Sequence, residues 1–176
     1  VTAMTAILFA HLAALALFMG LLLAAAMGDL QTYKIPNVYS LALLALYPVF
    51  ALTAPQSVSP LLSLGVMAGV FAAGFAVYAY GAMGGGDVKL LTVAALYAGP
   101  HFAVEFLAIT GIAGGMVALL MLNRPFRAGL AVALDSIGNR TLRDALLTDV
   151  IPYGVAIAAG GVYLTLRLVG AATDAA

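Results

Sequence analysis

The amino-acid sequence predicts an all-α integral membrane protein, a bundle of six transmembrane helices. Of its 176 residues, 65% are hydrophobic and only 8% are charged. A soluble domain carries roughly 25% charged residues, so this chain has too few polar groups to cover a surface that faces water. Apolar runs that approach the length needed to cross the hydrocarbon core, about 20 residues, recur along the chain. We therefore expect one membrane-embedded domain over residues 1–176.

The six helices are assigned from runs that are nearly free of charge. We expect them at residues 4–27, 38–54, 61–83, 88–98, 102–122 and 151–169. The fourth run is short and is taken as a crossing that continues toward Phe102. Arg167 lies near the far end of the sixth run, where a long side chain can reach the membrane interface. No basic segment precedes the first run, which is longer than the core of a signal peptide, so we expect it to be retained.

The basic residues indicate how these helices are oriented in the membrane. Six of the seven Lys and Arg residues fall in or beside the loops after the first, third and fifth helices, namely Lys34, Lys89, Arg124, Arg127, Arg140 and Arg143. Cytoplasmic loops are enriched in Lys and Arg, so we expect these loops in the cytoplasm and both termini outside it. If the fourth run did not cross the membrane, this separation would be lost. The charge pattern therefore favours six crossings.

Two aspartates are expected at the cytoplasmic end of this bundle. Asp29 follows the first predicted helix, and Asp87 precedes the fourth. Taken singly, each has a simple structural interpretation: Asp29 as a solvated residue at the membrane edge, and Asp87 as the N-cap of a helix that starts at Val88. The topology nevertheless places two carboxylates that are distant in sequence at one level of the bundle.

The residues beside the aspartates favour a functional interpretation. Gly84, Gly85 and Gly86 precede Asp87, and glycines lower helix propensity and allow an extended substrate to approach the backbone. Pro36 favours a break after Asp29, with the next helix starting near Asn37 or Val38. Irregular backbone at membrane depth is tolerated where it is buried in protein or lines a wet cavity. We therefore expect these segments to be buried in protein or to line a wet cavity.

Three motifs carry a resemblance to a known family. Gly84-Gly85-Gly86-Asp87 resembles the Gly-x-Gly-Asp signature of membrane aspartic proteases, and the following Val88-Lys89-Leu90-Leu91 resembles its prepilin peptidase form. Asp29, followed after six residues by Pro36-Asn37, is similar to the other half of the site. Ile151-Pro152-Tyr153-Gly154 resembles an element that opens the last helix of these enzymes. In this order, the motifs resemble the prepilin peptidase (type IV leader peptidase) family; Gln31 departs from it, because a basic residue is expected there.

The resemblance implies that Asp29 and Asp87 form a catalytic pair. Two adjacent carboxylates share a proton, so one activates water and the other protonates the departing nitrogen. This chemistry requires no acyl-enzyme, no cofactor and no metal. Which aspartate holds the proton stays open, because a coupled pair titrates as a unit.

The resemblance also implies a substrate and a location. Prepilin peptidases remove a short cytoplasmic leader from type IV prepilins or pseudopilins at the bacterial inner membrane. The chain has no cysteine and resembles the short, protease-only members that serve tight-adherence (Flp) pili, so we expect cleavage without N-methylation. The expected partners are the prepilin and the lipid bilayer. No basic domain points to a nucleic acid, and the oligomeric state stays open.

Further residues are candidates for shaping the site or binding the substrate. They are Gly84, Gly85, Gly86, Lys89, Lys34, Pro36, Asn37, Pro152, Tyr153 and Gly154. Lys89 has three open interpretations: it biases the carboxylates toward ionisation, contacts the substrate backbone, or anchors the chain at the cytoplasmic surface. Tyr153 is either a hydrogen-bond donor in the site or one of the tyrosines common at membrane interfaces. Pro152 and Gly154 are expected to shape the start of the last helix.

Other polar and glycine positions have structural interpretations. Residues 141–148 predict an amphipathic helix on the cytoplasmic leaflet, which tethers the chain to lipid headgroups or covers the aspartates; Asp144 and Asp149 are expected to be solvated. His101 and Glu105 are expected in a solvated outer loop rather than at a metal. Glycines four residues apart allow close helix packing, and we expect this of Gly65, Gly69, Gly111 and Gly115.

Two other functions are compatible with the aspartates. One is a Gly-x-Gly-Asp protease that cleaves transmembrane segments of other proteins. The other is a small proton-coupled transporter that uses Asp29 and Asp87 as a relay. Transporters are often built from internal repeats, and the two Asp-containing loops of this chain do not match each other, which favours a protease.

Overall fold

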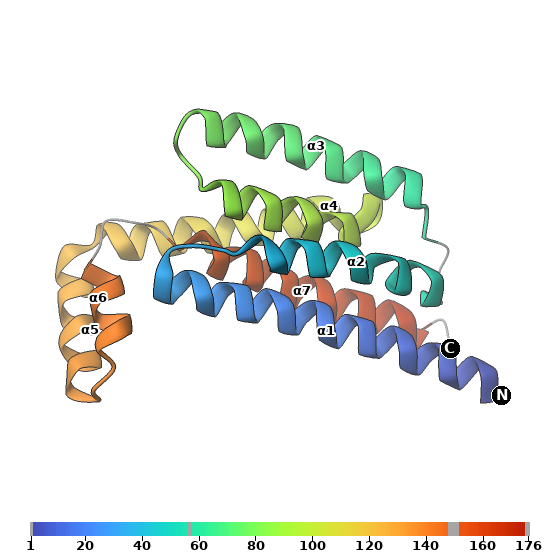
Figure 1. Cartoon of the computed structure of the whole chain (residues 1–176), viewed down its shortest axis with the longest axis horizontal. Coiled ribbons are helices and arrows are strands. Elements are labelled where there is room, and N and C mark those ends of the chain that lie inside the picture. Colours follow the sequence, from blue (N-terminus) through green and yellow to red (C-terminus); the bar gives the residue numbers. More distant parts are fainter. Residues whose placement is uncertain (1, 56–57, 148–151, 175–176) are drawn as a thin grey trace.

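The computed structural model describes residues 2–55, 58–147 and 152–174, and these residues form helices and no strand. The helices are α1 (Thr2–Thr32), α2 (Asn37–Thr53), α3 (Pro60–Ala79), α4 (Gly85–Leu122), α5 (Arg124–Ser136), α6 (Arg140–Leu147) and α7 (Tyr153–Asp174). Helices α1, α2, α3, α4 and α7 lie along one common direction, and α5 and α6 lie across one end of them (Figure 1). The fold is an all-α bundle, as predicted.

The longest helix, α4, consists of two helices joined at Gly99. This glycine has φ 54° and ψ −168°, and Pro100 follows it. The chain reverses direction there, so the second half of α4 returns to the end from which the first half started (Figure 1). The backbone conformation at Gly99 is one that only glycine adopts readily, and a Cβ atom there would lie 3.0 Å from the Ser63 Oγ of α3. The two halves correspond to the predicted fourth and fifth crossings.

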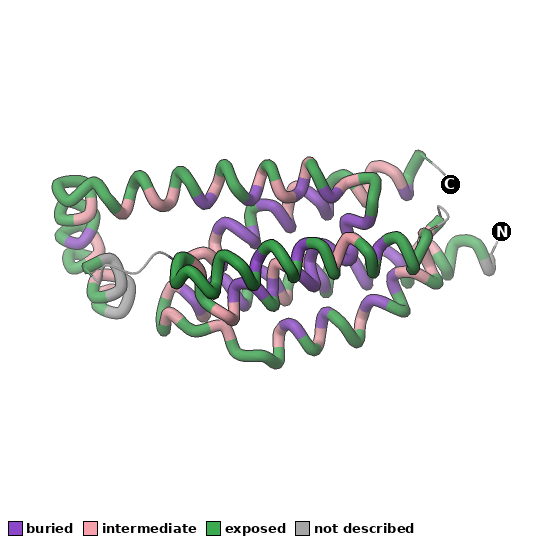
Figure 2. Tube along the Cα trace, turned by 90° about the horizontal axis from the view of Figure 1, so that it is seen from above, coloured by how far each residue is buried: buried purple, intermediate pink, exposed green. Residues whose placement is uncertain are grey.

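The helices have the length and composition of membrane spans. Four of the described helices, α1, α3, α4 and α7, are long and apolar enough to cross a membrane, and α2 is a shorter apolar helix. With the break in α4, each of the six predicted apolar runs forms a helix. Buried residues gather where the helices face one another (Figure 2). Large hydrophobic side chains such as Phe9 and Leu61 are exposed. The protein is therefore a multi-pass membrane protein, and α1 begins at the end where α7 finishes (Figure 1).

The predicted helix boundaries beside both aspartates were wrong. Helix α1 continues to Thr32, so Asp29 lies in its last turn rather than after it, and α4 begins at Gly85, so Asp87 lies in its first turn. The segment after residue 27 contains no proline before Pro36, and the single Gly28 does not end the helix. The Tyr33 N–H still donates to the Asp29 carbonyl oxygen at 2.9 Å. At α4, tertiary packing outweighs the low helix propensity of glycine.

Helix α3 ends at Ala79, four residues before the predicted boundary at residue 83. Its end is a Schellman motif: Gly81 has φ 73°, the Ala82 N–H donates to the Val77 carbonyl oxygen at 3.2 Å, and the Gly81 N–H donates to the Tyr78 carbonyl oxygen at 2.8 Å. Gly81 was the signal in the sequence that the longer prediction overlooked.

The polar stretch after α4 contains two helices, not one. The predicted helix corresponds to α6, while α5 was not predicted. Asn123 caps α5 by accepting a hydrogen bond of 3.0 Å from the Phe126 N–H. Arg143 of α6 pairs with Asp135 of α5 and with Asp144, each at 2.7 Å, so Asp144 is ion-paired as well as exposed. Thr148, at the end of the predicted helix, and Asp149 lie outside the described residues.

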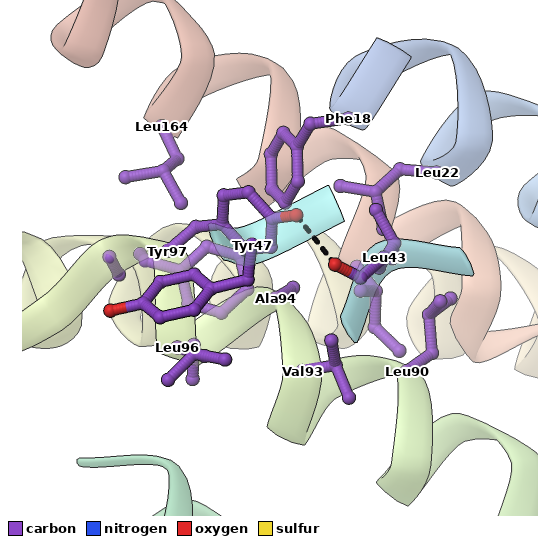
Figure 3. Close-up of a cluster of buried hydrophobic side chains, with 14 of the residues drawn as sticks. Phe18, Leu22, Leu43, Tyr47, Leu90, Val93, Ala94, Leu96, Tyr97 and Leu164 are labelled. Atoms are coloured by element: carbon purple, nitrogen blue, oxygen red, sulfur yellow. Dashed lines mark hydrogen bonds between the residues drawn. The ribbon is translucent and has the colours of Figure 1, made fainter. Parts of the chain in front are cut away.

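Aromatic side chains from α1, α2 and α4 fill the centre of the bundle (Figure 3). The rings of Phe18 and Tyr97 lie 4.4 Å apart between their centroids, and those of Tyr47 and Tyr97 lie 5.4 Å apart. The Tyr97 hydroxyl donates to the Leu43 carbonyl oxygen at 2.6 Å, which satisfies a buried polar group and joins α4 to α2. Removing this donor would leave a buried acceptor with one partner fewer.

The glycines that allow close helix packing are not those predicted. Among the described residues, a Cβ atom on Gly65, Gly69, Gly111 or Gly115 would meet no atom within 4 Å. By contrast, a Cβ on Gly160 would collide with Thr110 of α4, and one on Gly161 would collide with Leu22 of α1. Spacing by four residues places two glycines on one face, but it does not say whether another helix covers that face.

The prediction that Glu105 lies in a solvated loop was wrong, because this residue lies within α4. It accepts a hydrogen bond of 2.7 Å from the Tyr163 hydroxyl and pairs with the Arg167 Nε at 3.3 Å, so it links α4 to α7. His101 is exposed near the start of the second half of α4. Within the described part of the chain, no group of three or more His, Cys, Asp or Glu side chains is placed to hold a metal ion.

We expect the substitution Gly99→Ala to destabilise the protein by about 1–3 kcal/mol, the cost of a non-glycine residue in such a conformation. The measurement is thermal unfolding in detergent. Gly111→Ala, on the same helix and without a Cβ contact, is the control and should unfold at or slightly above the temperature of the parent, because Ala is the better helix former. Equal unfolding temperatures for Gly99→Ala and the parent would contradict this account of the break.

Candidate active site

Three helix ends converge at the end of the bundle where α5 and α6 lie: the last turn of α1 and the first turns of α4 and α7. Asp29 of α1 and Asp87 of α4 line the same cavity, which has a volume of about 510 Å³. The two residues are only 5% and 9% exposed. The structure therefore brings together the two carboxylates that the sequence placed at one level.

Asp29 is held by the start of α7. The Gly154 N–H donates to the Asp29 Oδ2 at 2.8 Å, across a sequence separation of 125 residues. The first N–H groups of a helix have no partner within it, and the positive end of the helix dipole attracts a carboxylate. A Cβ atom on Gly154 would lie 2.9 Å from both the Cβ and the Oδ2 of Asp29. This position therefore needs glycine for the contact to form.

Asp87 lies at the start of α4 but does not cap it. Gly84 occupies the N-cap position, so the simple structural interpretation of Asp87 as an N-cap is wrong. A Cβ atom on Gly84 would lie 2.7 Å from the Asp87 Oδ2. Among the described residues, the buried Asp87 Oδ1 has no hydrogen-bond partner. Buried polar atoms are normally paired, so this oxygen retains an unused capacity to form a hydrogen bond.

The connection between α1 and α2 forms the opposite wall of the cavity. Tyr33 has φ 52°, a left-handed conformation that is rare for residues other than glycine, and Pro36 then precedes α2. A Cβ atom on Gly86 would lie 3.1 Å from the Ile35 carbonyl oxygen, so this glycine allows α4 to approach the connection. Tyr33 and Ile35 were not predicted as site residues, because nothing in their residue types signals such a backbone.

Most of the other predicted site residues line this cavity. They are Lys34, Pro36, Asn37, Gly84, Gly85 and Gly86. Lys89 lies beside the cavity, where its Nζ donates to the Asn37 Oδ1 at 3.0 Å. Pro152 and Tyr153 do not line it; Tyr153 faces a smaller groove between α4 and α7. Ile151 lies outside the described residues, and no described residue of α5 or α6 lines the cavity.

The cavity therefore presents two carboxylates beside irregular, glycine-rich backbone. Carboxylates can give and take protons within hydrogen-bond reach of a reacting group. Backbone without bulky side chains leaves room for an extended peptide. Proton transfer to and from a group bound beside the carboxylates is the chemistry that these residues support.

Comparison with known proteins agrees with this chemistry. The model of the type IV leader peptidase family matches residues 16–119, more than half of the chain. The matched segment contains both aspartates and ends before α7. Neither the curated proteins nor the solved structures gave a match. The chain therefore belongs to the type IV leader peptidase family and is a membrane-embedded protease.

Proposed function

We propose that this protease is an aspartic endopeptidase that removes the short cytoplasmic leader from Flp-type prepilins or pseudopilins, with Asp29 and Asp87 as its catalytic pair. One observation carries the proposal: two buried carboxylates from different helices meet in one cavity. Membership of a peptidase family supports hydrolysis of a peptide bond and argues against a transporter.

The reaction follows from a proton shared between the two carboxyl groups. The ionised group takes a proton from water as the water oxygen attacks the scissile carbonyl carbon. The protonated group donates a hydrogen bond to the carbonyl oxygen in the transition state. The tetrahedral intermediate then collapses, the C–N bond breaks, and a proton passes to the leaving nitrogen. The hydrogen bond from Gly154 orients Asp29, and the Asp87 Oδ1 is available for water or for the carbonyl.

The charge distribution supports a cytoplasmic site in the bacterial inner membrane. Lys34 and Lys89 lie at the end of the bundle that carries the aspartates, and α5 and α6, with four arginines, lie at the same end (Figure 1). Positive charge collects on the cytoplasmic side of such proteins. A leader on that side would reach the cavity without crossing the membrane.

The first test replaces each aspartate by asparagine, which keeps the size of the side chain but cannot share the proton. We expect Asp29→Asn and Asp87→Asn each to lower the cleavage rate by roughly 10²–10⁴-fold, the usual contribution of a general acid or base. The measurement is the band shift of a co-expressed Flp-type prepilin.

The matched control for this test is Asp135→Asn, which alters an exposed aspartate paired with Arg143 and should cleave like the parent. All variants must be recovered in the membrane fraction. An aspartate variant that cleaves like the parent would remove that residue from the mechanism. If the parent cleaves no prepilin, the proposed substrate class is wrong.

The second test is Gly154→Ala, which places a methyl group where Asp29 now lies. A shift of about 1 Å in a catalytic group can cost roughly 10²-fold in rate, and we expect a loss of this order in prepilin cleavage. Gly28→Ala is the control, since a Cβ beside Asp29 in sequence would meet no described atom within 4 Å. Full activity of Gly154→Ala would show that this contact does not position Asp29.

A further inference from the structure

A second cavity, of about 530 Å³, is lined by residues of α2, of α3 and of the first half of α4. Its walls are mainly apolar, with Leu41 and Leu44 from α2 and Phe71 from α3. We call it the α2–α3 groove. Asn37 lines both this groove and the cavity that holds the aspartates, and Lys89, two residues after Asp87, also lines it. The α2–α3 groove therefore begins beside the candidate catalytic pair.

The α2–α3 groove is open toward the lipid. Helix α3 packs chiefly on α4 and is separated from α2 by the first half of α4 (Figure 1). The side chains that form the walls of the α2–α3 groove are exposed: Leu41 is 63%, Leu44 is 44% and Phe71 is 48% exposed. An apolar helix lying in the bilayer can therefore reach this surface from the side.

The floor of the α2–α3 groove carries a polar group without a partner. Thr92 of α4 is 6% exposed, and its hydroxyl makes no hydrogen bond to any described residue. A Thr side chain in a helix commonly bonds a carbonyl of the preceding turn, and leaving a buried hydroxyl unpaired is costly. Thr92 lies five residues beyond Asp87, about 7.5 Å along the helix axis. Thr92 lines the α2–α3 groove, so a rotation of its side chain would offer this hydroxyl to an occupant of the groove that carries a hydrogen-bonding group.

We propose that the α2–α3 groove holds the apolar segment of the substrate that follows the cleaved bond. This inference rests on the proposed function. With the scissile bond between Asp29 and Asp87, the leader lies on the cytoplasmic side and the rest of the substrate continues into the membrane beside Lys89 and Asn37. An apolar helix in a groove is a common mode of peptide recognition. A backbone carbonyl or a polar side chain of the substrate segment would form a hydrogen bond with the Thr92 hydroxyl. A lipid acyl chain has no group that can do so.

Disulfide cross-linking tests this placement, because the parent chain contains no cysteine. Leu44→Cys and Ala68→Cys put one thiol on each wall of the α2–α3 groove, in an Asp87→Asn background that keeps the prepilin intact. The prepilin carries a single cysteine in the first turns of its apolar segment. We expect both wall variants to cross-link to it.

Matched controls use exposed residues on other faces of the same helices. Val49→Cys is exposed and lies about 140° around α2 from Leu44, and Ala73→Cys is exposed on α3; neither lines the α2–α3 groove. Gly115→Cys probes the smaller groove between α4 and α7. Cross-links that are several-fold stronger at both walls support the proposal. Equal cross-linking at the controls, or cross-linking only from Gly115→Cys, overturns it.

The two proposals fail in different ways. Each cysteine variant is also made with Asp87 intact and assayed for prepilin cleavage. Cleavage without wall cross-links counts against the α2–α3 groove alone, while a parent that cleaves no prepilin overturns both proposals, because the second rests on the first.

A kinetic measurement provides an independent test. Ala68→Phe should fill the α2–α3 groove and raise KM by roughly tenfold with little change in kcat, the pattern expected when uniform substrate binding is lost. Ala73→Phe, which places the same side chain outside this groove, should leave both constants unchanged. An unchanged KM for Ala68→Phe would contradict the proposal.

Discussion

The hydrogen bond from the start of α7 to Asp29 connects the two ends of the chain at the point where the candidate chemistry lies. A carboxylate that is buried in a membrane-embedded bundle needs hydrogen-bond donors or a nearby positive charge. Here the Gly154 N–H and the dipole of α7 provide them for Asp29, while Asp87 lies in the first turn of α4. The last turn of α1 and the first turns of α4 and α7 must therefore meet at one place. The turns between the other helices bring these ends together.

Two turns of the bundle position those helix ends. The Schellman motif at Gly81 stops α3 so that α4 can begin at Gly85. The reversal at Gly99 returns the chain to the same end of the bundle, from which α7 later starts (Figure 1). Gly86 and Gly154 are required because another segment, rather than solvent, occupies the space of a side chain. Their low helix propensity is offset by the packing that their small size permits.

The cavity that holds the aspartates and the α2–α3 groove adjoin each other but differ in polarity. The cavity with the aspartates is lined by charged side chains and irregular backbone, whereas the walls of the α2–α3 groove are mainly apolar; both are lined by Asn37. A polypeptide that is polar at one end and apolar at the other matches this sequence of surfaces. The Lys89–Asn37 hydrogen bond lies between them, so it joins the two cavities at their common edge.

The sequence by itself determined the class of fold, the apolar helices and the pair of aspartates. These features depend on hydrophobicity and on helix breakers, which act locally and can be recognised from the residue types. It also indicated the chemistry, since Gly84–Asp87 and Asp29–Asn37 carry the family resemblance. Only the tertiary structure decided that Gly154 contacts Asp29, that Gly160 rather than Gly111 allows close packing, and that Thr92 lines an open groove. These features depend on which helix faces which, and this follows from the packing of the whole bundle rather than from the spacing of residues along one helix.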